Sequence, residues 1–302
     1  MNNELITVII TTYRRHFDML NRAIQSVLNQ TYNNLELIIV DDSPENYEQR
    51  DVIKKRIEEI EDNRIKYIQH SINKGACAAR NTGINNSKGN IIMFLDDDDE
   101  WLRDKIEFQV KALSEKNADF AYCSYKNIIE SNNKSRERII SRFYNDSIFF
   151  EKLMGENFIG SVSFVAIKKK CFEKCGLFNE ELKSCQDWDM WIRVLSKYKV
   201  CYVDKPLVIY HTHQMERITS NPKKQLQGHE FILSKYNKYL KKYPEALREN
   251  LYRLSRIYAD NNNYKKSFSL WAKGNRIKPF SFNQSAISIM RIVKRGCISL
   301  VD

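Results

Sequence analysis

Residues 90–99 read Asn-Ile-Ile-Met-Phe-Leu-Asp-Asp-Asp-Asp, so a short apolar run ends in four consecutive aspartates. The apolar run predicts a buried β-strand, and the acidic run places a cluster of carboxylates where that strand ends. Four adjacent carboxylates repel one another, and they therefore need a bound cation or full solvation. Mg²⁺ and Mn²⁺ prefer carboxylate oxygens and leave positions for phosphate oxygens. A metal site and a solvated acidic turn are both open interpretations of residues 96–99.

Segments of the same kind precede this strand along the chain. We predict strands over Leu5–Thr12, Leu35–Val40 and Arg64–Gln69, and helices over Phe17–Gln30, Tyr47–Glu61 and Gly75–Asn86. Strands separated by helices of this length form parallel sheets that helices cover on both faces. The sequence therefore predicts an α/β fold with a Rossmann-like, mostly parallel sheet. Residues 118–215 add shorter strands and one clear helix over Asp187–Tyr198.

Polar residues follow three of the predicted strands at their carboxyl ends. They are Thr11-Thr12-Tyr13, Asp41-Asp42-Ser43 and the aspartates of residues 96–99. Ligands of parallel sheets bind at this edge, so we expect the three clusters to form one site. Taken alone, Asp42 fits a turn and helix cap equally well. Residues 11–15 contain no glycine, which excludes a Walker or dinucleotide-binding loop there and favours phosphate binding by side chains and a metal.

Two further segments contain residues that could take part in catalysis or ligand binding. Asp187 lies at the start of a predicted helix, where an aspartate commonly caps the helix. It is also placed to act as a general base, and both interpretations stay open from position alone. His211 and His213 alternate on a predicted strand and therefore share one face. Metal or phosphate contact and a plain polar strand end are both compatible with this pair.

Length and composition limit the class of protein. The 302 residues suffice for one large domain and a smaller appendage, and an apolar content of 42% can build a core. Residues 1–4 show no basic region, and no apolar run approaches the ~20 residues of a membrane-spanning helix, so we expect a cytoplasmic location. The seven cysteines form no C-x-x-C pair, and we expect them to be buried thiols.

Positive charge is concentrated at the C-terminal end. Of the net charge of +11, residues 225–302 account for 15 Lys/Arg against five Asp/Glu. Helices are predicted near residues 226–241, 246–260 and 264–276, and a last amphipathic helix begins at about Phe282. Such basic helices suit an anionic membrane surface, although docking of the last helix on the protein core is an equal alternative. Nucleic-acid binding is the weakest interpretation, because no recognition motif accompanies the charge.

The ordered set of motifs resembles the family 2 glycosyltransferases, which have the GT-A fold. The resemblance covers about residues 5–220 and rests on these segments: 7–13, 30–32, 37–43, 73–83, 88–98, 176–180, 186–193 and 210–213. Each segment is a weak signal, but their order along the chain is specific. Two positions depart from the family pattern, since Gln186 stands where Glu is frequent and His211 where Arg is common. Residues 254–279 are similar in spacing to one tetratricopeptide repeat.

The resemblance implies a role for individual residues. A nucleotide-sugar donor would be bound by Thr11, Tyr13, Asp42, Arg80, Asn81, Asp96 and Asp97. Within that set, Asp42 would contact the base, usually uracil. Asp98 of the D-x-D element would bind Mn²⁺ or Mg²⁺, and His213 is a softer candidate for the same metal. Asp187 would be the catalytic base.

These implications define an expected function and domain organisation. We expect residues 1–220 to form the catalytic domain, with a nucleotide-binding half over about 1–100 and an acceptor half over about 101–220. Residues 221–302 would form a basic helical region that contacts the inner face of the cell membrane. The activity would be metal-dependent, inverting transfer of a sugar from UDP to a saccharide hydroxyl, with a lipid-linked acceptor, as in bacterial surface polysaccharide synthesis. A nucleotidyltransferase and a non-catalytic sugar-nucleotide-binding scaffold are the alternatives.

Overall fold

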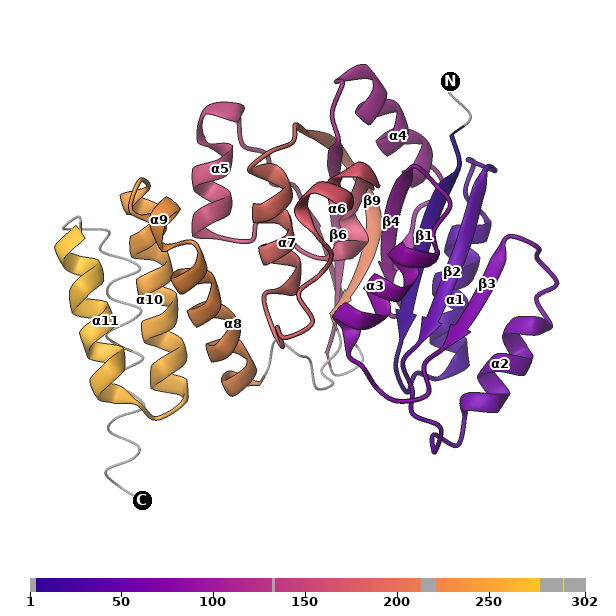
Figure 1. Cartoon of the computed structure of the whole chain (residues 1–302), viewed down its shortest axis with the longest axis horizontal. Helices are drawn as coiled ribbons and strands as arrows, with labels where there is room; N and C mark the ends of the chain where they lie inside the picture. The colour runs from indigo at the N-terminus through magenta and orange to yellow at the C-terminus, as the bar shows by residue number, and fades with distance from the viewer. Residues whose placement is uncertain (1–3, 132–133, 213–220, 278–289, 291–302) are drawn as a thin grey trace. The chain divides into compact units, whose positions relative to one another are not determined.

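The computed structural model describes residues 4–131, 134–212, 221–277 and 290. These residues fold into two compact units that interleave along the chain (Figure 1). Unit 1 comprises Met1–Phe143, Ile159–Glu180 and Arg193–Gln214, and unit 2 comprises Tyr144–Phe158, Glu181–Ile192 and Met215–Asp302. The short segments 144–158 and 181–192 therefore cluster with the C-terminal helices. A linear domain boundary near residue 220 remains a prediction.

Unit 1 is built on a mixed sheet with the order β3-β2-β1-β4-β8-β6-β9-β5, and β7 pairs with β6. The strands are β1 (Ile6–Thr12), β2 (Leu35–Asp41), β3 (Ile65–Gln69), β4 (Ile91–Asp96), β5 (Glu100–Trp101), β6 (Phe120–Ser131), β7 (Lys134–Ile140), β8 (Val165–Lys168) and β9 (Val200–Thr212). Strands β3, β2, β1 and β4 run parallel to one another, and β8 is antiparallel to both β4 and β6. The predicted α/β fold with a mostly parallel sheet is confirmed.

Helices of unit 1 connect these strands: α1 (Phe17–Leu28), α2 (Arg50–Glu58), α3 (Ala76–Asn86), α4 (Lys105–Glu115) and α6 (Lys170–Cys175). Helix α1 buries Leu20, Ile24 and Val27 on one face, the amphipathic pattern that the sequence predicts. Helix α3 approaches β1 so closely that a Cβ at Gly83 would lie 2.5 Å from Ile9 Cγ2. Only glycine fits this contact without displacing the Ile9 side chain.

The strand register brings the three predicted polar clusters to one edge. Strand β1 lies between β2 and β4, and Thr11 is paired with both Val40 and Asp96. Thr12 is paired with Asp41. Because all three strands are parallel, their carboxyl ends and the loops that follow them lie together. The three polar clusters therefore lie at the same edge of the sheet, and their forming one ligand site remains a prediction.

Unit 2 is helical. It contains α5 (Asp146–Gly155), the first turns of α7 (Gln186–Leu195), α8 (Pro222–Lys235), α9 (Asn237–Leu240), α10 (Pro244–Asp260) and α11 (Tyr264–Ile277). Helices α10 and α11 form a hairpin in which Ser255 and Ser267 each donate their hydroxyl to the other's backbone oxygen, at 2.8 and 2.6 Å. The three predicted helical segments between 226 and 276 are confirmed, and the helix expected from about Phe282 lies outside the described residues.

Within the described part of the chain, no helix is both long and apolar enough to span a bilayer. Six of the seven cysteines are described, and all six are free thiols. Four of them are buried as expected, whereas Cys175 and Cys185 are half-buried, so the expectation of burial is wrong for these two.

The core of unit 1 contains a lysine, Lys105, that has no exposed surface. Its Nζ donates to Gln109 Oε1 at 2.5 Å and lies 4.0 Å from the centroid of the Trp101 ring. Burial lowers the pKa of Lys105 to about 7. Around neutral pH the folded protein therefore holds this amine close to the midpoint of its titration.

We predict that this lysine makes stability depend on pH. Above about pH 7 the folded amine is neutral, whereas an unfolded lysine keeps its proton up to about pH 10. The unfolded state then binds more protons than the folded state, so the free energy of unfolding rises with pH between about 7 and about 10. This gain in stability is lost again as the pH falls toward about 7. Lys105→Met should flatten the rise by about 1 kcal/mol per pH unit. Urea unfolding at pH 7, 8 and 9 measures it, and parallel curves for both proteins would contradict the prediction.

Candidate active site

The four consecutive aspartates divide into two kinds. The side chains of Asp96 and Asp98 are 30% and 32% exposed. Asp97 and Asp99 are buried, at 5% and 0% exposure of the whole residue. The turn after β4 thus presents two carboxylates to solvent and turns two into the protein. The sequence could not predict which of the four aspartates are buried, because the alternation of side chains between the two faces of a strand ends where the turn begins.

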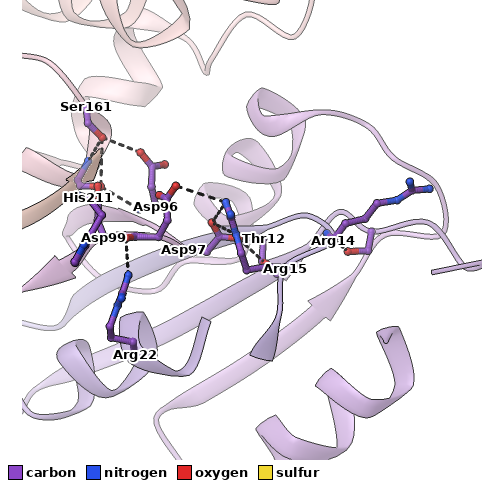
Figure 2. A network of polar contacts seen from close by, with 12 residues as sticks. Thr12, Arg14, Arg15, Arg22, Asp96, Asp97, Asp99, Ser161 and His211 are labelled. Carbon is purple, nitrogen blue, oxygen red and sulfur yellow. Dashed lines mark hydrogen bonds and ion pairs between the residues drawn. The ribbon is translucent and has the colours of Figure 1, made fainter. Parts of the chain in front are cut away.

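Asp97 fixes the loop after β1. Its Oδ2 accepts a hydrogen bond from Thr12 Oγ1 at 2.7 Å, and its Oδ1 pairs with Arg15 Nη2 at 2.7 Å (Figure 2). Burial raises the pKa of Asp97 above its usual value, and the Arg15 guanidinium opposes this rise. Arg15 also lies 3.6 Å from Asp98 Oδ2. Asp97 is placed to position its neighbours, and its proposed contact with the donor remains a prediction.

Asp96 is held from two other elements. Arg80 Nη2 of α3 lies 3.1 Å from Asp96 Oδ1, and the Arg80 guanidinium carbon lies 5.6 Å from the ring centroid of Phe178. Ser161 Oγ donates to Asp96 Oδ2 at 2.8 Å. Two donors therefore fix the carboxylate while leaving part of it exposed. Arg80, which the family resemblance singled out, does lie at the acidic turn.

Asp99 is the deepest of the four carboxyl groups. It accepts from Ser163 Oγ at 2.6 Å and from the backbone N–H of His211 at 3.3 Å. Burial, together with the charges of Asp96 and Asp98, raises the pKa of Asp99 well above its usual value. The ring of His211 contacts Glu100 Oε1 at 2.7 Å. His211 is thus a partner of the acidic turn, and β9 is attached to that turn.

The segment 160–164 was missed by sequence reasoning. Ser161 and Ser163 contribute the hydroxyl groups that hold Asp96 and Asp99, and Ser163 Oγ also accepts from the backbone N–H of Asp96 at 3.0 Å. Gly160 has φ +87°, a backbone conformation that favours glycine, at the entrance to this segment. No motif marks it, and only the pairing of β8 with β4 brings it to the site.

Asp42 and Asn81 have their side chains engaged within unit 1. Asp42 accepts from the backbone N–H groups of Lys74 and Gly75 at 2.8 and 2.7 Å and contacts the His70 ring at 2.8 Å. Asn81 donates to Phe178 O and accepts from Phe178 N, both at 2.9 Å. Both residues therefore stabilise the backbone beside the strand ends. Contact of Asp42 with a base stays a prediction, and Asn81 supports the neighbouring turn.

The remaining donor candidates lie on and after β1. Thr11 is half-buried at the strand end, and Tyr13 is 44% exposed. Arg14 has φ +48° and its backbone N–H donates to Ser43 Oγ at 2.8 Å. This bond joins the loop after β1 to the loop after β2. The exposed ring of Tyr13 is available to stack on a planar ligand.

The residues of the acidic turn fit a divalent cation that a ligand completes. Asp96 and Asp98 offer partly exposed carboxylate oxygens, which are the hard donors that Mg²⁺ and Mn²⁺ take. Among the described residues there is no cluster of three or more His, Cys, Asp or Glu side chains arranged to hold a metal. The protein donors would therefore be completed by diphosphate oxygens and water. His213, the other metal candidate, lies outside the described residues.

Asp187 belongs to unit 2, near the start of α7. Its Oδ1 accepts from the backbone N–H of Trp188 at 2.9 Å, and its Oδ2 accepts from Asn157 Nδ2 at 3.0 Å. Asp189 in the same helix is fully buried, and its Oδ1 lies 2.7 Å from both Lys235 Nζ and Tyr236 Oη. The two aspartates therefore differ, since Asp189 is neutralised by a cation. Gln186, the departure from the family pattern, donates to Leu182 O at 2.8 Å.

The sequence matches one family model and several known glycosyltransferases. Residues 7–176 match the family model described as glycosyl transferase family 2. The chain is 32% identical over 264 residues to WcaA of Escherichia coli K12, assigned to colanic acid biosynthesis as a glycosyl transferase, covering 86% of this chain and 90% of WcaA. It is 29% identical to the E. coli UDP-Glc:α-D-GlcNAc-diphosphoundecaprenol β-1,3-glucosyltransferase WfgD, covering 75% of this chain and 84% of WfgD. The chain spans half the length or less of several other curated relatives.

Solved structures share the fold. S. aureus TarS 1–349 in complex with UDP-GlcNAc superposes with a TM-score of 0.57 at 17% identity, over 96% of this chain and 81% of TarS 1–349. The mannosyltransferase PcManGT of Pyrobaculum calidifontis, in complex with GDP-Man and Mn²⁺, superposes with a TM-score of 0.58 at 16% identity. That match covers 96% of this chain and 86% of PcManGT. At such identities the likeness concerns the fold.

Proposed function

The chain belongs to glycosyltransferase family 2, and on this premise we propose that it transfers a sugar from UDP to a saccharide hydroxyl with inversion at the anomeric carbon. The observation that carries the proposal is the acidic turn, which presents Asp96 and Asp98 where β1, β2 and β4 end. A nucleoside diphosphate is an anion, so carboxylates alone would repel it. A divalent cation between these carboxylates and the diphosphate would remove that repulsion.

The residues at the carboxyl ends of the strands would bind and orient the nucleotide-sugar donor. Tyr13 would stack on the base, and Asp96 and Asp97 would contact the ribose and diphosphate. Asp98 would hold Mn²⁺ or Mg²⁺, which when bound neutralises charge on the diphosphate leaving group. Arg80 and Ser161 fix the Asp96 carboxylate, so little reorganisation is needed when the donor arrives.

At the acceptor end, Asp187 would remove the proton from the attacking hydroxyl. The hydroxyl oxygen then bonds to the anomeric carbon as the bond to the diphosphate breaks, with oxocarbenium character between. A single displacement of this kind inverts the anomeric centre and needs no covalent intermediate. The neighbouring thiol is a poor nucleophile, because burial raises the pKa of Cys185 to about 12.

The relatives support a narrower proposal. The name of WfgD specifies UDP-glucose and a diphosphoundecaprenol-linked acceptor, and the name of WcaA specifies colanic acid biosynthesis. PcManGT holds GDP-Man and Mn²⁺, which supports a metal and leaves GDP as the competing nucleotide. We infer a UDP-sugar, a lipid-linked saccharide acceptor and a role in surface polysaccharide synthesis. Helices α8 to α11 would contact the inner face of the cell membrane through exposed lysines, with Lys238, Lys241, Lys265 and Lys266 among them.

A donor screen tests the proposal. Calorimetry would measure the binding of UDP-, GDP- and dTDP-sugars with Mn²⁺ and, separately, with EDTA. We expect preferential binding of one UDP-sugar that EDTA weakens, followed by a product whose anomeric proton shows inverted configuration by NMR. Preference for GDP would correct the nucleotide alone. Absence of binding by every nucleotide, with and without metal, would overturn the enzymatic proposal and favour the scaffold alternative.

A further inference from the structure

Three consecutive backbone oxygens end helix α5, and each one accepts from a side chain of another helix. Leu153 O accepts from Trp188 Nε1 at 2.6 Å. Met154 O accepts from Asn250 Nδ2 at 2.9 Å, and Gly155 O accepts from Arg253 Nη1 at 2.8 Å. The last four carbonyls of a helix have no partner within it, so these three donors satisfy groups that burial would otherwise leave costly. Two of the donors come from α10.

Helix α10 also packs against the end of α5 without spare room. A Cβ on Gly155 would lie 2.4 Å from Glu249 Oε2 and 3.4 Å from the Cα of Ala246. The guanidinium carbon of Arg253 lies 5.3 Å from the centroid of the Trp188 ring. Arg253 therefore contacts both α5, through Gly155 O, and α7, through the indole. The three helices α5, α7 and α10 meet at this point, all within unit 2.

The contacts continue directly to Asp187. Asn157 follows the end of α5 by two residues, and its Nδ2 donates to Asp187 Oδ2 at 3.0 Å. Trp188, the next residue after Asp187, is 2% exposed and is held by Leu153 O. The backbone beside the carboxylate and the carboxylate itself are thus both fixed by residues 153–157. Those residues are in turn fixed by Asn250 and Arg253.

We propose that helix α10, through Asn250 and Arg253, is a positioning element for Asp187, and that Asn157 is the last link in this contact chain. The inference rests on the proposed role of Asp187 as general base. It gives the C-terminal helical region a part in the chemistry, in addition to any contact with a membrane. A base must be held to within about 0.5 Å of its working position, and loss of residues that orient an active group typically costs 10- to 100-fold in activity.

The first test needs no substrate. Hydrogen exchange of the amides of residues 186–191 would be compared in the wild type, Arg253→Met and Asn157→Ala. The matched control is Tyr252→Phe, which removes a part-buried hydrogen bond of 2.9 Å from Tyr252 of α10 to Asn275 of α11. We expect exchange in this segment to be about tenfold faster in Arg253→Met and within twofold of wild type in Tyr252→Phe. Equal exchange in Arg253→Met and the control would overturn the inference.

The second test asks whether the contact chain matters for catalysis. With the UDP-sugar that the donor screen selects, Asn157→Ala and Arg253→Met should lower kcat about tenfold and leave UDP affinity within twofold. Asn157→Ala should also shift the acidic limb of the kcat–pH profile to higher pH, because the Asn157 amide stabilises the charged form of the Asp187 carboxylate. Asn157→Ala keeps the inference testable if Arg253→Met fails to fold. Wild-type kcat in both variants, with Asp187→Asn inactive, would overturn the inference alone. An active Asp187→Asn would overturn the proposed base as well.

Discussion

Asp98→Ala is expected to lower the Mn²⁺-dependent affinity for UDP on the order of 100-fold. Of the two partly exposed carboxylates on the acidic turn, Asp96 is held by Arg80 and Ser161. Asp98 Oδ2 lies 3.6 Å from Arg15 Nη2, which lies closer to Asp97, at 2.7 Å. Asp98 is the residue of the D-x-D element to which the family resemblance gives the metal, and its carboxylate is partly exposed. Its removal should abolish most of the difference in UDP affinity between Mn²⁺ and EDTA.

The control for this experiment is Asp104→Ala. Asp104 is also an aspartate of unit 1, but its carboxylate is paired with Lys205 and takes no part in the acidic turn. Calorimetry of UDP binding with Mn²⁺ should give affinities within twofold of wild type for Asp104→Ala. Since the readout is binding, it does not depend on finding the acceptor. Full retention of Mn²⁺-dependent UDP binding in Asp98→Ala would mean that the metal is held by other residues.

The edge of the sheet was predictable because its signals are local. An apolar run followed by polar residues marks both a buried strand and its end, as at Leu95-Asp96 and Val40-Asp41. Parallel strands must have their carboxyl ends at the same edge, so the clusters after β1, β2 and β4 come together whatever the details of the loops. The pairing of Thr11 with both Val40 and Asp96 realises this expectation.

The partners of the acidic residues were not predictable from the same signals. Ser161 and Ser163 stand more than 60 residues after the aspartates they contact, in a segment with the composition of an ordinary loop. Arg15 follows a strand end, but nothing in its sequence position tells that it would pair with Asp97. The serine contacts depend on the antiparallel placement of β8 beside β4, and the Arg15 contact depends on the parallel pairing of β1 with β4. Both are properties of the whole sheet.

The packing of α5 with the C-terminal helices in unit 2 could not be predicted from the spacing of apolar residues either. Helix α5 reads as part of the middle of the chain, yet it packs on α10 and clusters with the C-terminal helices. The relevant signals are single residues, since Gly155 permits close approach and Arg253 caps a carbonyl. A pattern of apolar residues records which face of a helix is buried. It does not record which helix covers that face.

Asp187→Asn is expected to lower kcat about 1,000-fold while leaving UDP affinity within twofold. The substitution separates the two interpretations of this residue. Asparagine is as good a helix cap as aspartate, and its side-chain oxygen can still accept from the backbone N–H of Trp188. It cannot accept a proton from an acceptor hydroxyl. A residue that only caps α7 would therefore tolerate the change, and a general base would not.

Asp189→Asn provides the contrast within the same helix. Its carboxylate is fully buried and accepts from Lys235 and Tyr236, so the change removes the charge from two buried hydrogen bonds and the ion pair with the partly exposed Lys235. We expect Asp189→Asn to lower the free energy of unfolding by about 2 kcal/mol, because hydrogen bonds to a charged group are lost, with kcat of the folded fraction nearly unchanged. Asp187→Asn should show the reverse, an unchanged unfolding curve and a lost kcat. Near-wild-type turnover in Asp187→Asn would assign Asp187 to capping and require another base, because inversion by a single displacement still needs one group to take the hydroxyl proton.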